Sequence, residues 1–359
     1  MLKQERKKIV VAMSGGVDSS VAAKILVEQG HDVLGIFLNF WKDPDAKNIE
    51  NKCCSTKALL DARMVCDQIG IRLYTFDFVN TFKTKIVDNF ISEYKAGRTP
   101  NPCVRCNKYV KLGLLLKKVE ELGYNYLATG HYSIIKNTKD KKGVELFKGE
   151  DQKKDQSYFL YKLSQKQLQK IILPLGEYTK VEVREMAEKW GLLVAKKSES
   201  QEICFVPKDH NDFLKKYLQL KRGLIKTLDD QVVGEHNGLS LYTIGQRKGV
   251  EIGGIGPFYV VRKDLKTNIL YVTGDTMDDQ LFMDQFGIKE VNWVNEVSFP
   301  LACDAVIRYG SKLVVCTVDM NNLKKECFVN LKEKVRAITS GQSIVFYDKN
   351  KLLGGGVIM

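Results

Sequence analysis

Short apolar runs alternate with amphipathic stretches over the first 130 residues of this 359-residue chain. The apolar runs predict buried strands over 9–13, 32–38, 71–77 and 126–129. The stretches between them predict helices over 18–29, 56–69, 81–95 and 109–122. Strand–helix alternation indicates an α/β fold, a doubly wound parallel sheet with right-handed crossovers.

The pattern changes in the second half of the chain. A hairpin with a charged tip is predicted over 133–149, and helical structure over 162–191. Later, short alternating runs predict strands over 259–261, 269–272, 305–307, 313–318, 343–346 and 357–358. No helix longer than a turn or two is expected after residue 218. We therefore expect one or two small β-rich domains behind the α/β domain.

Composition narrows the functional class. The longest apolar runs are too short for a membrane span or a secretory signal, so we expect a cytoplasmic protein with no membrane partner. The formal net charge of +13 favours a polyanionic partner such as nucleic acid. Nine cysteines, an odd number, argue against a disulfide framework.

The stretch MSGGVDSS, 13–20, follows the first predicted strand and opens a helix. Backbone N–H groups at such a turn form an anion site, and the adjacent glycines Gly15 and Gly16 allow close approach. The stretch lacks the Gly-Lys-Ser/Thr ending of a Walker A loop and the third glycine of a dinucleotide fingerprint. The turn is therefore predicted to hold phosphates in another way.

This stretch resembles the SGGxDS loop of the ATP pyrophosphatase (PP-loop) superfamily, whose fold is adenine-nucleotide α-hydrolase-like. The resemblance implies that ATP is cleaved to AMP and pyrophosphate, with Mg²⁺ held through Asp18. It also implies an ATP site made by Ala12, Met13, Ser14, Gly15, Gly16, Val17, Asp18, Ser19, Leu38 and Gly130. Several different adenylating reactions use this loop, so the loop alone does not choose among them.

Two further stretches place cysteines among polar loop residues. They are GRTPNPCVRCNKYVK, 97–111, and KSESQEICFVP, 197–207. Basic neighbours and the start of a helix should lower the pKa of Cys103 and Cys106, which favours the thiolate. With Cys204 they suggest sulfur chemistry or a metal cluster. A zinc half-site, a thioredoxin-like site and inert loop thiols are the alternatives. We interpret Cys53, Cys54 and Cys66 as packing residues.

The chain as a whole resembles the tRNA-specific 2-thiouridylase (MnmA/TrmU) family. The resemblance rests on AMSGGVDSSVAA, GIFLNFW, EYKAGRTPNPCVRCNKYVK, LATGHY, KDQSYFL, SQEICFV and YTIGQRKG. It implies a tRNA-uridine 2-sulfurtransferase that acts on the wobble uridine, position 34, of tRNAs for Lys, Glu and Gln. It also implies a catalytic domain over 1–206, a central β-rich domain over 207–275 and a C-terminal β-barrel over 276–359.

The resemblance assigns roles residue by residue. Cys106 matches the nucleophile and Cys204 the persulfide carrier, and the two would form a transient disulfide. Contacts with tRNA are implied for Asn101, Pro102, Cys103, His131, Lys154, Asp155, Gln156, Arg308, Tyr309 and Gln342. The sulfur donor implied is a cysteine desulfurase, acting directly or through a sulfur relay.

Alternatives remain at this point. Many members of the family carry Asp where this chain has Cys103, so Cys103, Cys106 and Cys204 could instead ligate a 4Fe–4S cluster. An amidoligase-type enzyme that adenylates a small metabolite would explain the loop but not the cysteines. A tRNA-binding protein without catalysis would leave the loop at Ser14 to Ser20 unexplained.

Overall fold

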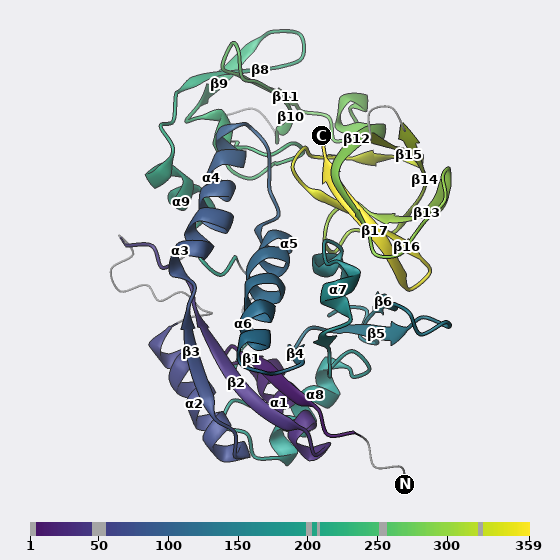
Figure 1. Cartoon of the computed structure of the whole chain (residues 1–359). Coiled ribbons are helices and arrows are strands. Elements are labelled where there is room, and N and C mark those ends of the chain that lie inside the picture. Colours follow the sequence, from purple (N-terminus) through teal and green to yellow (C-terminus); the bar gives the residue numbers. More distant parts are fainter. Residues whose placement is uncertain (1–4, 45–54, 199–202, 207–208, 251–256, 322–325) are drawn as a thin grey trace.

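The computed structural model describes residues 5–44, 55–198, 203–206, 209–250, 257–321 and 326–359 (Figure 1). In this part of the chain no helix is long and apolar enough to cross a membrane. Three sheets organise the molecule: a parallel sheet, a small mixed sheet and a larger antiparallel sheet.

The parallel sheet has the strand order β3-β2-β1-β4-β7. Its strands are β1 (Lys8–Met13), β2 (Asp32–Asn39), β3 (Leu73–Asp77), β4 (Tyr126–Ala128) and β7 (Ile171–Ile172). The described helices are α1 (Val17–Glu28), α2 (Thr56–Ile69), α3 (Val79–Phe82), α4 (Asp88–Lys95), α5 (Pro102–Cys106), α6 (Leu115–Glu121), α7 (Gln165–Leu168), α8 (Lys180–Lys189) and α9 (His210–Tyr217). Helix α1 packs against both α2 and α8, and the central strand β1 is buried between its neighbours.

The four predicted strands and the first two predicted helices are confirmed with ends shifted by a few residues. The helix predicted over 81–95 begins at Val79 and includes the π-helical segment η1 (Lys83–Val87). The helix predicted over 109–122 begins earlier, at Pro102, and continues through the π-helical segment η2 (Asn107–Leu114) into α6. Both cysteines of the first cysteine stretch therefore lie inside this helix and not before it.

The prediction of helical structure over 162–191 is wrong for its middle part. Only α7 and α8 are α-helical there, and β7 between them joins the edge of the parallel sheet beside Leu127 and Ala128. Paired isoleucines favour a strand, and Pro174, which follows them, cannot donate the backbone hydrogen bond that a helix needs. The edge strand β7 therefore forms where a helix was expected.

The middle sheet has the order β10-β11-β8-β9. Its strands are β8 (Gly223–Lys226), β9 (Val232–His236), β10 (Tyr259–Asp264) and β11 (Ile269–Thr273). The antiparallel sheet closes into a six-stranded barrel, because β12 pairs with both β15 and β17. Its strands are β12 (Phe282–Trp293), β13 (Leu301–Val306), β14 (Val314–Asn321), β15 (Glu326–Arg336), β16 (Ser343–Asp348) and β17 (Lys351–Ile358).

The predicted hairpin is confirmed as β5 (Ser133–Asn137) and β6 (Val144–Lys148), and β6 adds to β17 at the side of the barrel. The pattern failed to predict β8, β9, β12 and β15. The pairing of β12 shifts register twice, between Met283 and Gln285 and between Lys289 and Asn292, which breaks its alternation. In β15, alternation stops after Leu331, where three consecutive residues are exposed.

The barrel supports the loop that precedes α5. Thr99 donates its backbone N–H to the Ser340 carbonyl at 2.9 Å, and the Gln342 side chain donates to the Thr99 carbonyl at 3.0 Å. Tyr158 donates its hydroxyl to the Ser343 carbonyl at 2.8 Å from the segment η3 (Ser157–Leu160). The first cysteine stretch is therefore fixed between the parallel-sheet domain and the barrel (Figure 1).

Candidate active site

The turn after β1 is held in shape by its own serines. Ser19 accepts a hydrogen bond from the Ser14 N–H at 3.2 Å, and the Ser20 hydroxyl donates to the Gly16 carbonyl at 2.8 Å. Gly15 has a φ of +69°, and a Cβ there would lie 2.1 Å from the Ala58 carbonyl oxygen. No other residue fits at this position. The turn is therefore preformed, with its N–H groups at the start of α1.

A cavity of about 280 Å³ lies at the carboxyl ends of β1, β2 and β4. Its lining residues are Ala12, Met13, Ser14, Asp18, Ser19, Leu38, Phe40, Lys111, Thr129, Gly130, His131 and Gln156. The structure thus brings most of the predicted ATP residues together with two predicted tRNA residues, His131 and Gln156. Gly15, Gly16 and Val17 lie outside this lining. Gly130 packs tightly, because a Cβ there would lie 2.8 Å from the carbonyl carbon of Asp18.

Asp18 is the centre of a hydrogen-bond network that the sequence did not predict. One of its carboxylate oxygens accepts from the Tyr132 hydroxyl at 2.8 Å and from the Lys180 ammonium at 2.5 Å. The Lys180 side chain is only 8% exposed, while that of Asp18 is 34% exposed toward the cavity. Lys180 thus places a buried positive charge beside the phosphate-binding turn. It lies far from Asp18 in sequence, so no spacing pattern could reveal it.

A second lysine contacts the same turn. The Lys197 ammonium donates to the Gly15 carbonyl at 2.8 Å and pairs with Asp61 at 2.5 Å. Lys197 belongs to the stretch that leads to Cys204. The turn and the second cysteine stretch are therefore joined directly through this side chain.

His131 is held in its neutral form. Its Nδ1 and the Thr129 hydroxyl share a hydrogen bond at 2.7 Å, and both residues line the cavity. Burial, reinforced by the charge of Lys111, lowers the pKa of His131 to about 3. At neutral pH the imidazole can therefore exchange hydrogen bonds with a ligand but adds no charge.

The first cysteine stretch is ordered by a helix cap. The Asn101 side chain accepts from the Val104 N–H at 3.2 Å, and Pro102 occupies the first position of α5. Cys103 is exposed in the first turn, whereas Cys106 is buried one turn later. The field of the helix N-terminus falls off within the first turn, so it acts more strongly at Cys103 than at Cys106.

The second cysteine stretch is anchored by an aromatic cluster. Cys204 is half-buried, and the next residue, Phe205, packs against Phe82 with ring centroids 5.7 Å apart. Phe82 in turn stacks on Phe40 at 4.7 Å, and Phe40 lines the cavity. A continuous chain of rings therefore joins the segment of Cys204 to the nucleotide cavity.

The three loop cysteines do not form a ligand set. Among the residues that the structure describes, no three His, Cys, Asp or Glu side chains are grouped so that they could hold a metal ion. A cluster held by Cys103, Cys106 and Cys204 stays a prediction. Burial raises the pKa of Cys66 to about 12, which agrees with a packing role. Cys53 and Cys54 lie outside the described residues.

The remaining predicted tRNA residues lie on a surface between η3 and the barrel. Asp155 and Tyr309 line one cavity of about 370 Å³, and the Tyr309 ring lies 4.4 Å from that of Phe159. Asp155 accepts from the Gly149 N–H at 3.0 Å and the Ser157 hydroxyl at 2.8 Å. Burial raises the pKa of its carboxyl. Lys154 and the exposed Arg308 are their chain neighbours. The hydrogen bonds of Asp155 therefore hold the loop between Gly149 and Ser157 in place.

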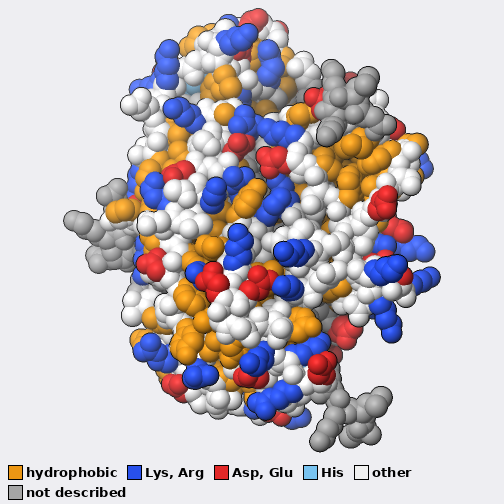
Figure 2. Space-filling model, viewed as in Figure 1, with side chains coloured by type: hydrophobic (Ala, Val, Ile, Leu, Met, Phe, Trp, Pro, Cys, Tyr) orange, Lys and Arg blue, Asp and Glu red, His pale blue; other side chains and the backbone are white. Residues whose placement is uncertain are grey.

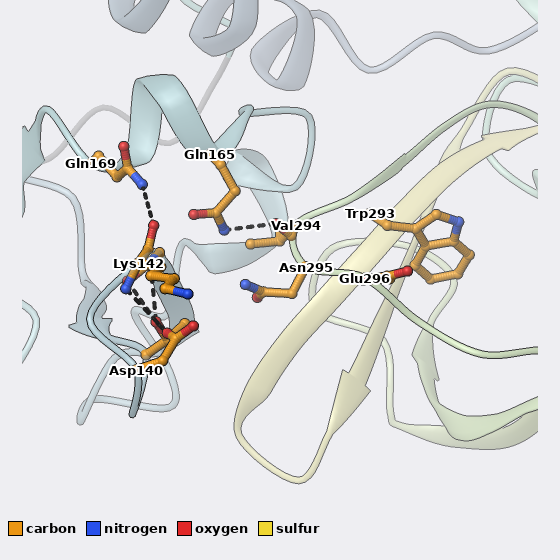
Figure 3. A pocket seen from close by; sticks show the side chains of 10 residues that line it. Asp140, Lys142, Gln165, Gln169, Trp293, Val294, Asn295 and Glu296 are labelled. Atoms are coloured by element: carbon orange, nitrogen blue, oxygen red, sulfur yellow. Dashed lines mark hydrogen bonds between the residues drawn. The ribbon is translucent and has the colours of Figure 1, made fainter.

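Figure 3 shows a separate cavity of about 490 Å³, between the β5–β6 hairpin, α7 and the end of β12. Gln165 donates to the Val294 carbonyl at 2.7 Å, and Gln169 donates to the Lys142 carbonyl at 3.2 Å. None of the predicted site residues lines this cavity. Its hydrogen bonds join the hairpin to α7 and the barrel, which is a structural role.

Comparisons with known proteins agree with this three-part layout. Residues 7–208 match the family model of the tRNA methyl transferase HUP domain, 211–274 that of the tRNA methyl transferase PRC-barrel domain, and 283–358 that of the aminomethyltransferase beta-barrel domain. The chain is 45% identical to the tRNA-specific 2-thiouridylase MnmA of Carboxydothermus hydrogenoformans, with 98% of each chain covered. It is 43% identical to the MnmA of Buchnera aphidicola, with 100% of this chain and 98% of the relative covered. It is 44% identical to the MnmA of Streptococcus mutans, with 100% and 96% covered. The chain belongs to the MnmA family of tRNA-specific 2-thiouridylases.

Proposed function

We propose that this protein catalyses the ATP-dependent 2-thiolation of the wobble uridine, position 34, of tRNAs for Lys, Glu and Gln. The observation that carries the proposal is the link between the two halves of the site. The cavity that contains Ser14 and Asp18 also contains Phe40, and Phe40 connects through Phe82 to the segment of Cys204. This link supports a reaction in which the segment of Cys204 serves the nucleotide cavity.

In the first step, the uridine O2 attacks the α-phosphorus of ATP and pyrophosphate leaves. The turn at Ser14 to Ser19 binds phosphates through its N–H groups, and Lys180 offsets negative charge that develops on them. Asp18 would hold Mg²⁺ through its carboxylate, which is partly exposed, and that ion would neutralise phosphate charge. Leu38 and Gly130 bound the space left for the adenine. The neutral imidazole of His131 orients the uracil by hydrogen bonding.

In the second step, the terminal sulfur of a persulfide on Cys204 replaces AMP at uridine C2. Adenylation makes this possible, because AMP leaves far more readily than the original oxygen. The Cys106 thiolate attacks the Cys204 sulfur and breaks the sulfur–sulfur bond, so a Cys106–Cys204 disulfide forms. A cellular thiol reductant resets it. A cysteine desulfurase, directly or through a relay, supplies the next persulfide sulfur.

The tRNA is placed by surfaces on both sides of the cavity. Arg308 and Lys154 contact phosphates, and Tyr309, which is 44% exposed on its stacked neighbour Phe159, offers a ring face to a base. Asn101 and Gln342 position the cysteine stretch that borders the reacting base. The wobble base leaves its stack to enter the cavity. We also propose that the catalytic, central and barrel domains extend over 1–206, 207–275 and 276–359.

The proposal is tested by incubating the enzyme, purified without oxygen, with ATP, a sulfur donor and tRNA for Lys. Formation of 2-thiouridine at position 34, with AMP and pyrophosphate release that requires the tRNA, is the expected result. ATP turnover on a small metabolite without RNA would instead identify an amidoligase-type enzyme.

The same sample distinguishes the two sulfur routes. A colourless, iron-free and active enzyme agrees with the persulfide route and with the cysteine arrangement. About four irons per chain, lost together with activity on chelation, would show that a cluster is needed after all.

A further inference from the structure

A groove lies beside the continuous helix formed by α5, η2 and α6, and it has no role in the reaction described above. It has a volume of about 410 Å³ and lies between α3 and η1, η2 and α6, and α7. Five lysines and one tyrosine dominate its lining, namely Lys85, Lys108, Lys117, Lys166, Lys170 and Tyr109. Lys and Arg side chains also gather over the middle of the face seen in Figure 2.

The charge of this lysine groove is largely uncompensated. Glu120 is the only carboxylate in its lining, and it pairs with Lys170. In the described part of the chain, no ion pair is found for Lys85, Lys117 or Lys166, all of which are exposed, or for Lys108. Holding like charges together without partners costs free energy, which a polyanion bound in the groove would recover.

Two cations lie close to the ring of Tyr109, which lines the groove. The Arg105 guanidinium is 5.0 Å and the Lys108 ammonium 5.5 Å from its ring centroid. Arg105 also donates to the Lys85 carbonyl at 2.7 Å, which fixes η1 against α5. Gln167 donates to the Leu112 carbonyl at 2.9 Å and fixes α7 on the opposite side. The groove is therefore a rigid, cationic surface with an aromatic ring, which suits phosphates flanking a stacked base or ribose.

The position of the groove next to Cys106 indicates which polyanion binds there. Lys108 lies two residues after Cys106 on the same continuous helix, and Lys117 lies roughly 16 Å from Cys106 along that helix at the usual rise per residue. A nucleotide bound beside Cys106 would bring the next few phosphates of its strand alongside these lysines. From this continuity we infer that the lysine groove binds the RNA backbone of the substrate next to the reacting nucleotide. The inference rests on the proposed function and adds a contact surface to it.

The test compares two double variants of the full chain that change the net charge equally. Lys117→Glu with Lys166→Glu reverses two exposed groove lysines, and Lys139→Glu with Lys189→Glu reverses two exposed lysines outside the groove. The dissociation constant for tRNA is measured at several salt concentrations, and the melting temperature serves as the folding check. We expect the groove variant to bind tRNA at least tenfold more weakly than the control, with a salt slope smaller by about two.

Two results would overturn the inference. One is equal tRNA affinity and salt slope in the two double variants while the wild-type enzyme thiolates tRNA, which refutes the groove and leaves the proposed function standing. The other is normal tRNA binding by the groove variant with impaired sulfur transfer from a protein donor but not from inorganic sulfide. That result would assign the groove to an acidic protein partner. Failure of the wild-type enzyme to thiolate any tRNA would refute the proposed function itself.

Discussion

The nucleotide cavity and the cysteine region are built in different ways. The cavity draws its chemistry from one preformed turn, and one carboxylate oxygen of Asp18 already has fixed partners in Tyr132 and Lys180. The cysteine region draws Cys106 and Cys204 from two separate segments with different exposure. On the proposed route, ATP binds to a site that is already arranged, whereas sulfur transfer brings together two cysteine segments from different parts of the chain. Substitutions in the cavity should therefore lower the rate of adenylation partially. Substitutions of Cys106 or Cys204 should abolish the sulfur-transfer step.

The largest expected effect belongs to the cysteines. Cys106→Ser and Cys204→Ser should each lower tRNA thiolation at least about 10³-fold, because a hydroxyl neither carries a persulfide nor attacks one well. AMP and pyrophosphate release that depends on tRNA should persist in both variants, since the cavity is a separate structure. Mass spectrometry of the tRNA and a pyrophosphate assay measure the two steps.

Cys103→Ser is the matched control for these variants. Cys103 carries no sulfur in the persulfide route, and serine keeps a small polar side chain at this exposed position, where a contact with tRNA is implied, so this variant should keep most of the thiolation activity. A loss as large as that of the other two would contradict the separation of roles and favour three equivalent cluster ligands.

The next effect tests the fixed charge at the cavity. Lys180→Gln should slow tRNA-dependent pyrophosphate release by about 10²–10³-fold, because a buried donor beside the developing phosphate charge is lost. Lys197→Gln should cost about tenfold, since Lys197 contacts a backbone carbonyl and Asp61 and acts only through the shape of the turn. Single-turnover adenylation kinetics measure both rates. Equal losses in the two variants would show that Lys180 has no special role.

The same contrast explains what the sequence could and could not predict. The turn at Ser14 to Ser19 and its strand are contiguous, so local pattern and glycine placement were enough to locate the phosphate site. Lys180 and Tyr132 meet Asp18 only after the chain has folded, and each alone looks like an ordinary surface lysine or core tyrosine. Strand β12 was missed for a related reason, because its register shifts are set by its partners.

A smaller effect is expected where Gly130 approaches the turn. In Gly130→Ala the new Cβ would lie 2.8 Å from the Asp18 carbonyl carbon and 2.9 Å from the Ser19 nitrogen, so the turn must shift. We expect the dissociation constant for ATP to rise about tenfold, which is about 1.4 kcal/mol. Calorimetric titration with ATP measures it. Gly274→Ala, where nothing lies within 4 Å, is the neutral control. Unchanged ATP affinity in Gly130→Ala would mean that the turn is less rigid than its hydrogen bonds indicate.

The smallest effect concerns protonation of His131. Its pKa is lowered to about 3 in the folded protein, so below pH 6.5 the unfolded chain takes up a proton that the folded chain refuses. This residue alone should therefore cost about 1 kcal/mol of stability at pH 6.0 relative to pH 8, and more as the pH falls toward 3. The His131→Gln variant should not suffer this loss of stability at low pH. The melting temperatures of wild type and variant should therefore converge or cross as the pH is lowered from 8 to 5. NMR of the histidine side chains gives the direct measurement, with the variant assigning the resonance. A His131 signal that titrates near 6.5 would show that the imidazole becomes charged in the cavity, and it would then act on the phosphates as a cation.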